Sequence, residues 1–180
     1  MTVIVDISKG IFPVLIGFGF GLPVWAVSMS GVAAVAGQMW PLLGGHGEKG
    51  NSTGVGALMA LALVYESYLV LASLGFFAIG GLAVLVTSRT PMAERSKGKH
   101  PLHPVFPAAM LLGFTAAPAL SAFARAPWGI TAALGTTVFI IAVRRLTAGL
   151  RTDMSVGAPM GPVLLRRLLF DQPLTGRDWS

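Results

Sequence analysis

The sequence predicts an all-α protein, a polytopic bundle of about six membrane helices with a short interfacial helix near the C-terminus. Hydrophobic residues make up 54% of the 180 residues and charged residues only 11%, and the mean hydropathy is +0.74. Soluble domains carry about 25% charged residues, so a chain this apolar needs the bilayer as its solvent. In addition, several apolar stretches of membrane-spanning length alternate with loops that hold most of the basic residues.

Four stretches are each long enough and apolar enough to form a membrane helix, which needs about 20 residues. They are Val3 to Phe20, Val24 to Leu43, Val105 to Phe123 and Trp128 to Val143. The apolar segment 54–87 is too long for one span and carries Glu66 near its middle, where a charge is costly. We therefore expect two short helices there, with a turn at residues 65–68.

Basic residues in the loops predict the orientation of these helices. Four of them crowd the segment 88–103, which the preference of Lys and Arg for cytoplasmic loops places inside the cell. Counting spans from there puts the loop 44–53 and the tail after Arg144 on the same side, and Glu66 and Arg125 outside. The formal net charge of +6 then reflects topology and anionic lipid. Nucleic acid is a poor alternative partner, because the positive charges flank the membrane.

The tail contains the segment 162–170, in which two arginines interrupt an apolar run. This pattern predicts a short amphipathic helix on the inner membrane surface, most simply as an anchor. We expect residues 1–150 to form a single transmembrane domain and residues 151–180 a cytoplasmic tail. The absence of cysteine excludes disulfides, thiolate metal sites and a thioester on the protein. Metal chemistry has little support in the sequence, and no cofactor is expected.

The loop 44–53, Gly-Gly-His-Gly-Glu-Lys-Gly-Asn-Ser-Thr, is the most informative stretch. Its glycines let backbone N–H groups turn towards an anion, Lys49 supplies positive charge, and Ser52 or Thr53 can cap the next helix. Phosphate binding at that helix N-terminus is one interpretation, and a flexible connector with a cap is an equal alternative. Because Gly50 follows the lysine where a Walker A motif has Ser or Thr, nucleotide hydrolysis is disfavoured.

Asp6 and Lys9 lie three residues apart on one face of the first predicted helix, within or beside the membrane. Charged residues in such positions are commonly functional. The competing interpretation is a neutralised pair that fixes helix packing, with Lys9 reaching to the interface. Pro13 would then only kink the helix.

Three motifs follow one another along the first third of the chain: Asp6-x-x-Lys9-Gly10-x-x-Pro13, Gly37-x-x-Trp40-Pro41 and Gly47-x-Lys49-Gly50-x-x-Thr53. Together they resemble the bacterial acyl-phosphate:glycerol-3-phosphate acyltransferases, the PlsY family. Their order and spacing match the second helix and the cytoplasmic glycine-rich motif of that family, with one residue fewer between the last two motifs. Further on, Arg145-Leu146-x-x-Gly149 looks like the core of the third family motif.

The chain departs from the family pattern at several positions. It begins where the second helix of the family begins, so the first family helix and its Ser-Gly-Asn motif have no counterpart in residues 1–180. Gln38 stands where the family usually has histidine, and Glu48 replaces a glycine. Phe139, Ala142 and Arg151 occupy positions where the third motif offers histidine, asparagine and glutamate. These differences bear on catalysis more than on membership.

The resemblance implies transfer of a fatty acyl group from acyl phosphate to the 1-hydroxyl of glycerol 3-phosphate, giving lysophosphatidic acid for phospholipid biosynthesis. Acyl phosphate is already activated, so no acyl-enzyme is needed and the protein chiefly brings two phosphate-bearing substrates together. The catalytic residues would then be Lys49 and Arg145. The substrate-binding residues would be Asp6, Lys9, Gln38, Gly47, Gly50, Ser52 and Thr53.

The implied location is the bacterial plasma membrane, with membrane lipid as a partner, the acyl chain among the apolar spans and both phosphates at the cytoplasmic face. A second hypothesis is a diverged homologue without turnover that binds lipid headgroups or a partner helix. A small transporter ranks third, because the chain shows few intramembrane charges and no paired broken helices. His46 is more simply a solvated loop residue than a general base. The sequence leaves protein partners open.

Overall fold

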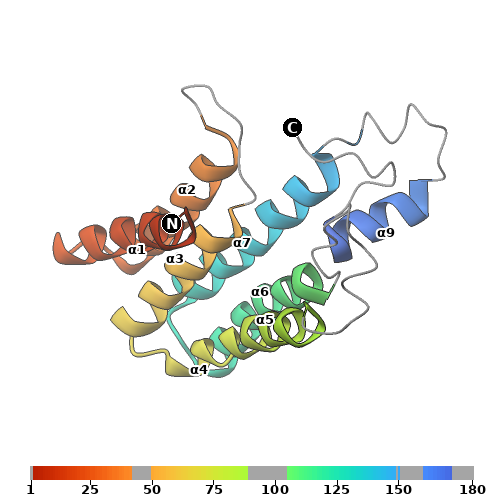
Figure 1. The fold of residues 1–180 in the computed structure, drawn as a ribbon. Helices are drawn as coiled ribbons and strands as arrows, with labels where there is room; N and C mark the ends of the chain where they lie inside the picture. Colours follow the sequence, from red (N-terminus) through yellow and green to blue (C-terminus); the bar gives the residue numbers. More distant parts are fainter. Residues whose placement is uncertain (1, 42–49, 89–104, 149, 151–159, 172–180) are drawn as a thin grey trace.

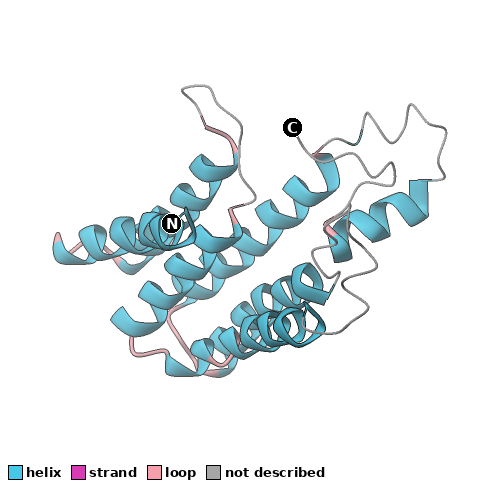
Figure 2. Cartoon of the chain, viewed as in Figure 1, coloured by secondary structure: helices cyan, strands magenta, loops and turns pink. Residues whose placement is uncertain are grey.

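The computed structural model describes residues 2–41, 50–88, 105–148, 150 and 160–171. All regular structure in these residues is helical, which confirms the predicted all-α class (Figures 1 and 2). The helices are α1 (Thr2–Gly19), α2 (Val24–Met39), α3 (Asn51–Val64), α4 (Tyr68–Leu71), α5 (Leu74–Ser88), α6 (Val105–Phe123), α7 (Trp128–Thr147) and α9 (Met160–Phe170).

The four predicted spans correspond to α1, α2, α6 and α7. Two segments, Phe106–Phe123 and Trp128–Thr147, are long and apolar enough to cross a membrane, whereas the apolar helices α2 and α3 are shorter. α2 ends at Met39, before its predicted end, because the residue that precedes a proline, here Trp40 before Pro41, is disfavoured in a helix. The lengths support a membrane protein, and the number of six spans stays a prediction.

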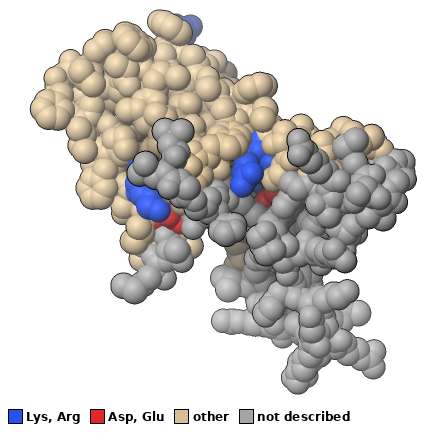
Figure 3. All heavy atoms as spheres, turned by 90° about the horizontal axis from the view of Figure 1, so that it is seen from above, with Lys and Arg blue, Asp and Glu red and all other residues tan. Residues whose placement is uncertain are grey.

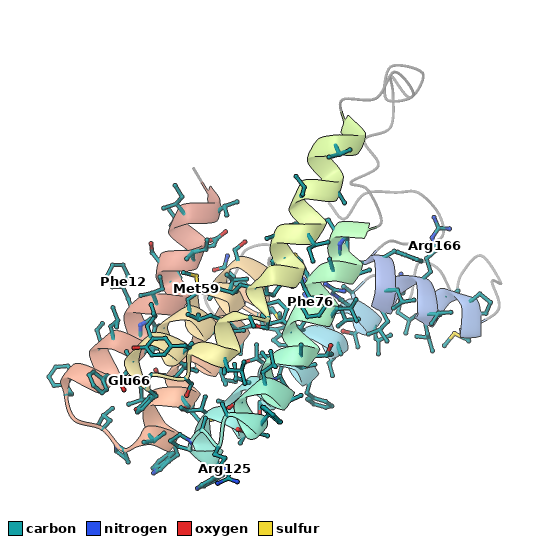
Figure 4. All side chains as sticks on the ribbon, turned by 90° about the horizontal axis from the view of Figure 1, so that it is seen from below. Phe12, Met59, Glu66, Phe76, Arg125 and Arg166 are labelled. Carbon is teal, nitrogen blue, oxygen red and sulfur yellow. The ribbon has the colours of Figure 1, made fainter. Side chains whose placement is uncertain are left out.

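The long apolar segment turns where the sequence predicts, but the second of its two predicted helices is divided into α4 and α5. α3 ends at Val64, and Glu66 adopts a left-handed conformation with φ 53°. The N–H group of Ser67 then donates to the carbonyl oxygen of Ala62 at 2.8 Å, which closes a Schellman motif. Arg125, with φ 52°, ends α6 in the same way. Figure 4 shows both turns at the same end of the bundle, in keeping with helices that alternate in direction.

α1 and α3 approach each other so closely that their backbones touch. A Cβ atom at Gly10 would lie 2.0 Å from the carbonyl oxygen of Thr53, and one at Gly56 would lie 2.0 Å from that of Ile7. No side chain fits at either position. Small residues are the usual means of packing membrane helices, because the lipid supplies no hydrophobic driving force between them. The contact brings the face of α1 that carries Asp6 beside the start of α3.

α7 joins the two halves of the bundle. It contacts α2 and α3 on one side and α6 on the other, while α5 packs on α6 (Figure 1). Ile130 of α7 belongs to the core cluster of α1, α2 and α3, and Ile141 belongs to the cluster that contains Phe114 of α6. The ring of Phe114 also meets that of Phe77 edge to face, with centroids 5.1 Å apart. α7 therefore contributes to both core clusters, and each cluster holds residues from both halves of the bundle.

The predicted amphipathic helix near the C-terminus is present as α9. It packs against α6 and α7, with Val163 and Arg167 buried, while Arg166 points away from the bundle (Figure 4). The guanidinium of Arg167 donates to the carbonyl oxygen of Ala148 at the end of α7. α9 is thus tied to the bundle by its buried face, and its position on the membrane surface stays a prediction.

We expect Gly10→Ala to destabilise the protein, because the added methyl group forces α1 and α3 apart. Overpacking of a core costs about 1–3 kcal/mol, and a contact with rigid backbone belongs at the upper end. Thermal unfolding in detergent, followed by circular dichroism, measures the loss.

The matched control is Gly135→Ala in α7, where a Cβ atom meets nothing within 4 Å. Alanine is favoured over glycine inside a helix by about 0.5–1 kcal/mol, so this variant should unfold at the same or a higher temperature than the wild type. Equal stability of Gly10→Ala and the wild type would contradict the close contact.

Candidate functional site

A pocket of about 900 Å³ lies among the helices, at the end of the bundle where α2 ends and α3 begins. It is lined by residues of α1, α2, α3, α5, α6 and α7 and by the residue after α9. The polar lining residues are Asp6, Gln38, Asn51, Ser52, Thr53, Arg144, Arg145 and Asp171. The others are Val3, Ile7, Gly50, Val55, Phe77, Ala78, Phe106, Met110 and Ala148. In Figure 3, which looks down on this end, basic and acidic side chains adjoin in two separate places.

The predicted pairing of Asp6 with Lys9 is confirmed, and Gln38 of α2 joins the pair. The Lys9 Nζ atom donates to Asp6 Oδ1 at 3.0 Å and to Gln38 Oε1 at 3.2 Å, and Gln38 Nε2 donates to Asp6 Oδ1 at 3.3 Å. The Asp6 side chain is 10% exposed and that of Lys9 50%. A nearly buried carboxylate is therefore held by two donors, while the ammonium group of Lys9 reaches the surface.

The start of α3 presents backbone donors to the pocket. Gly50 precedes the helix with φ 68°, and a Cβ atom there would lie 2.6 Å from the Cε atom of Met39, so both conformation and space require glycine. The prediction that Ser52 or Thr53 caps α3 is wrong: Gly50 is the N-cap and makes no side-chain cap bond, so both residues fall in the first turn. The first N–H groups of a helix have no acceptor in their own helix, and they attract anions.

Thr53 adds a polar group without a partner to this helix terminus. The residue is fully buried, and its Oγ1 atom has no hydrogen-bond partner among the described residues. The Oδ1 atom of Asn51, a partly buried residue, likewise has no hydrogen-bond partner in the described part of the chain. Buried polar atoms are nearly always satisfied in native proteins, so an unsatisfied hydroxyl that lines a pocket favours a ligand as the missing partner.

Arg145, in the last turn of α7, is anchored on one side of its guanidinium. Its Nη1 atom donates to the carbonyl oxygens of Pro107 at 3.1 Å and Leu168 at 2.9 Å, and the residue is only 4% exposed. Its Nε and Nη2 atoms have no hydrogen-bond partner in the part of the chain that the structure describes. These two atoms form one edge of the guanidinium, and such an edge suits bidentate bonding to phosphate or carboxylate.

Most of the residues predicted from the sequence come together. Asp6, Gln38, Gly50, Ser52, Thr53 and Arg145 line the pocket, and Lys9 bonds two of them. Gly47 and Lys49 lie outside the described residues, so their roles stay predictions. The sequence analysis did not select Asn51 and Arg144, although both adjoin residues that it did select. It gave no indication of Asp171, which follows α9 and reaches the pocket through the packing of that helix on α6 and α7.

Comparison with known proteins gives a family match. A model described as glycerol-3-phosphate acyltransferase matches residues 1–151. The curated glycerol-3-phosphate acyltransferase of Synechococcus sp. (strain CC9902) is 39% identical over 87 residues, which are 48% of this chain and 40% of the relative. That of Rubrobacter xylanophilus is 34% identical over 94 residues, 52% of this chain and 44% of the relative. No solved structure matches the chain significantly.

The matched part spans about two fifths of the length of these two curated relatives. The family model, in contrast, covers most of this chain and includes all pocket-lining residues except Asp171. It confirms the resemblance carried by the motifs at Asp6, Gly37 and Gly47. The chain therefore belongs to the glycerol-3-phosphate acyltransferase family.

Proposed function

We propose that the protein transfers a fatty acyl group from acyl phosphate to glycerol 3-phosphate, giving lysophosphatidic acid for phospholipid biosynthesis. The observation that carries the proposal is the meeting, in one pocket, of incompletely bonded groups from two helices: the start of α3 with Thr53, and the free edge of Arg145. The names of the relatives support glycerol 3-phosphate as acceptor. Acyl phosphate as donor follows from the motif resemblance alone.

Positive charge is what this reaction needs from the protein, because both substrates carry phosphate and repel each other. The 1-hydroxyl oxygen attacks the acyl carbon, the bond from that carbon to the phosphate oxygen breaks, and inorganic phosphate leaves as the hydroxyl proton is released. Arg145 and the first N–H groups of α3 stabilise the phosphates, together with Lys49 in the preceding loop. Asp6 and Gln38, with Lys9 bonded to both, form one wall of the site and orient the acceptor.

The apolar side of the pocket suits an acyl chain. α5 and α6 contribute only apolar residues to the lining: Phe77, Ala78, Phe106 and Met110. Phe77 is held by its edge-to-face contact with Phe114, so this wall is firm. The chain would lie against α5 and α6, with its phosphate end towards α3 and α7. This division of the lining supports an amphipathic substrate.

The proposed setting is the bacterial plasma membrane, crossed about six times, with the glycine-rich loop and the C-terminus in the cytoplasm. Short turns at Gly21, Glu66 and Arg125 follow α1, α3 and α6, whereas the pocket lies towards the opposite ends of these helices. α5 ends and α6 begins on that opposite side, and the basic segment 88–103 lies between them in the sequence. Soluble glycerol 3-phosphate would then enter from the cytoplasm, while the acyl chain lies against the apolar residues of α5 and α6.

One observation favours the second candidate, a homologue that binds phosphate headgroups without turnover. Gln38 stands where the family usually has histidine, and its amide is bonded to both Asp6 and Lys9. An amide cannot exchange protons as an imidazole can, so any step that relied on that histidine would be lost. This candidate retains anion binding and predicts no product.

Lysophosphatidate formation from acyl phosphate and labelled glycerol 3-phosphate, in detergent or bilayers, tests the proposal. We expect product with the wild type, and a loss of kcat/KM of about 100-fold for Arg145→Lys, because lysine lacks the free guanidinium edge and a hydrogen bond to a charged group contributes about 1.5–3 kcal/mol. Lys49→Ala should lose activity to a similar extent.

The matched control for the arginine is Arg125→Lys, in an exposed turn distant from the pocket, which should leave kcat/KM unchanged. Acyl carrier protein and coenzyme A thioesters, assayed in parallel, test the donor. Folded wild-type protein that makes no product from any of the three donors would sink the acyltransferase proposal and leave the headgroup-binding homologue.

Thr53→Val removes the unpartnered hydroxyl while keeping the shape of the side chain. Because that hydroxyl has no partner in the described structure, we expect thermal stability to stay equal or to rise. The KM for glycerol 3-phosphate should rise about 10-fold, the loss expected for one hydrogen bond to a charged ligand.

Thr137→Val is the matched control, because that hydroxyl is buried too but bonds the carbonyl oxygen of Ala133 in its own helix. It should leave the KM unchanged. An unchanged KM in Thr53→Val would show that the hydroxyl does not meet the substrate.

A further inference from the structure

The residue that follows α9, Asp171, lines the pocket, although it lies beyond residues 1–151 that the family model matches. α9 contacts both α6 and α7. Its buried Arg167 donates to the carbonyl oxygen of Ala148, the residue that caps α7. Arg145, one turn earlier in α7, donates in return to the carbonyl oxygen of Leu168 at 2.9 Å. These two bonds fix the last turn of α9 against the last turn of α7.

Asp171 follows directly on that last turn. Its N–H group donates to the carbonyl oxygen of Arg167 at 2.9 Å, its φ is 52°, and the residue is 9% exposed. It lines the same pocket as Arg145, and the two opposite charges attract each other. Asp6 is the other acidic residue among the described lining residues, and its carboxylate is already paired with Lys9.

We propose that Asp171 is an internal counterion of Arg145, which the phosphate group of the substrate displaces when it enters the pocket. This inference rests on the proposed function, because it takes that phosphate group to be the one of glycerol 3-phosphate. A buried guanidinium without an opposite charge is costly, so a carboxylate beside it stabilises the empty site. A phosphate dianion that arrives at the same guanidinium is repelled by that carboxylate. Asp171 therefore weakens anion binding and sets its strength.

The geometry of Arg145 separates this role from a purely structural one. The Nη1 atom is held by two carbonyl oxygens, of Pro107 and Leu168, so the guanidinium keeps its place when the carboxylate of Asp171 is removed. A residue needed only to position Arg145 would, on removal, weaken anion binding. Removal of a counterion would instead strengthen anion binding. The two roles therefore predict opposite changes in the Kd for phosphate.

Asp171→Asn is a well-matched substitution, because asparagine enters the left-handed backbone region as readily as aspartate does. Titration calorimetry of the full-length protein in detergent, with inorganic phosphate and with glycerol 3-phosphate at fixed pH and ionic strength, measures the effect. We expect the Kd of both ligands to fall about 5- to 10-fold, and 10-fold corresponds to about 1.4 kcal/mol. Asp171→Gly, which is also compatible with positive φ, should likewise lower the Kd of both ligands. It serves as the second variant if Asp171→Asn does not fold.

The matched control is Glu66→Gln, which removes one negative charge in the exposed turn after α3 and should leave both Kd values unchanged. Unchanged or weaker phosphate binding by the folded Asp171 variants, or no binding by any form, overturns the counterion. Tighter binding in the variant without acyl transfer by the wild type would keep the counterion and reject the enzyme. Acyl transfer by the wild type, together with an unchanged Kd in the variant, would support the enzyme and reject the counterion.

Discussion

The backbone contact between α1 and α3 determines where the polar groups of the pocket lie. Gly10 and Gly56 leave no room for a Cβ atom, so the two helices meet in one register. In that register Asp6 lines the same pocket as the first turn of α3, which carries Thr53. α2 joins the pair at Gly31, where a Cβ atom would lie 3.0 Å from that of Ala57, and the end of α2 brings Gln38 to Asp6 and Lys9. If one of these helices shifted along its axis, the polar residues of α1, α2 and α3 would no longer meet at the same pocket.

Four of the five buried side-chain atoms without a hydrogen-bond partner among the described residues belong to the pocket lining, and the fifth is the Oγ atom of Ser28 in α2. Hydroxyl groups along the helices bond carbonyl oxygens of their own helix, as at Thr115 and Thr136. Thr53 and the free edge of Arg145 depart from this pattern at the pocket. In a low-dielectric setting such groups are costly until they are bonded, so an anion that bonds them is favoured at this place in the bundle. On this account the cost of unsatisfied donors is offset by the substrate.

The sequence was sufficient wherever a local signal decided the structure. Apolar length predicted α6 and α7, and the charge of Glu66 marked the turn between α3 and α4. Prediction from the sequence failed where tertiary packing decided the structure. Ser52 and Thr53 are typical cap residues, yet the left-handed Gly50 starts the helix earlier. Asp171 enters the pocket only because α9 packs against α6 and α7, and no spacing rule relates it to Arg145, 26 residues earlier.

The most direct test of the central claim is an experimental structure of the protein with glycerol 3-phosphate bound. The account predicts phosphate oxygens at about 3 Å from Thr53 Oγ1 and from the Nε and Nη2 atoms of Arg145. It also predicts that the carboxylate of Asp171 lies farther from the guanidinium than it does without the ligand. Phosphate bound outside this pocket, with the hydroxyl of Thr53 and the edge of Arg145 still unpaired, would contradict it.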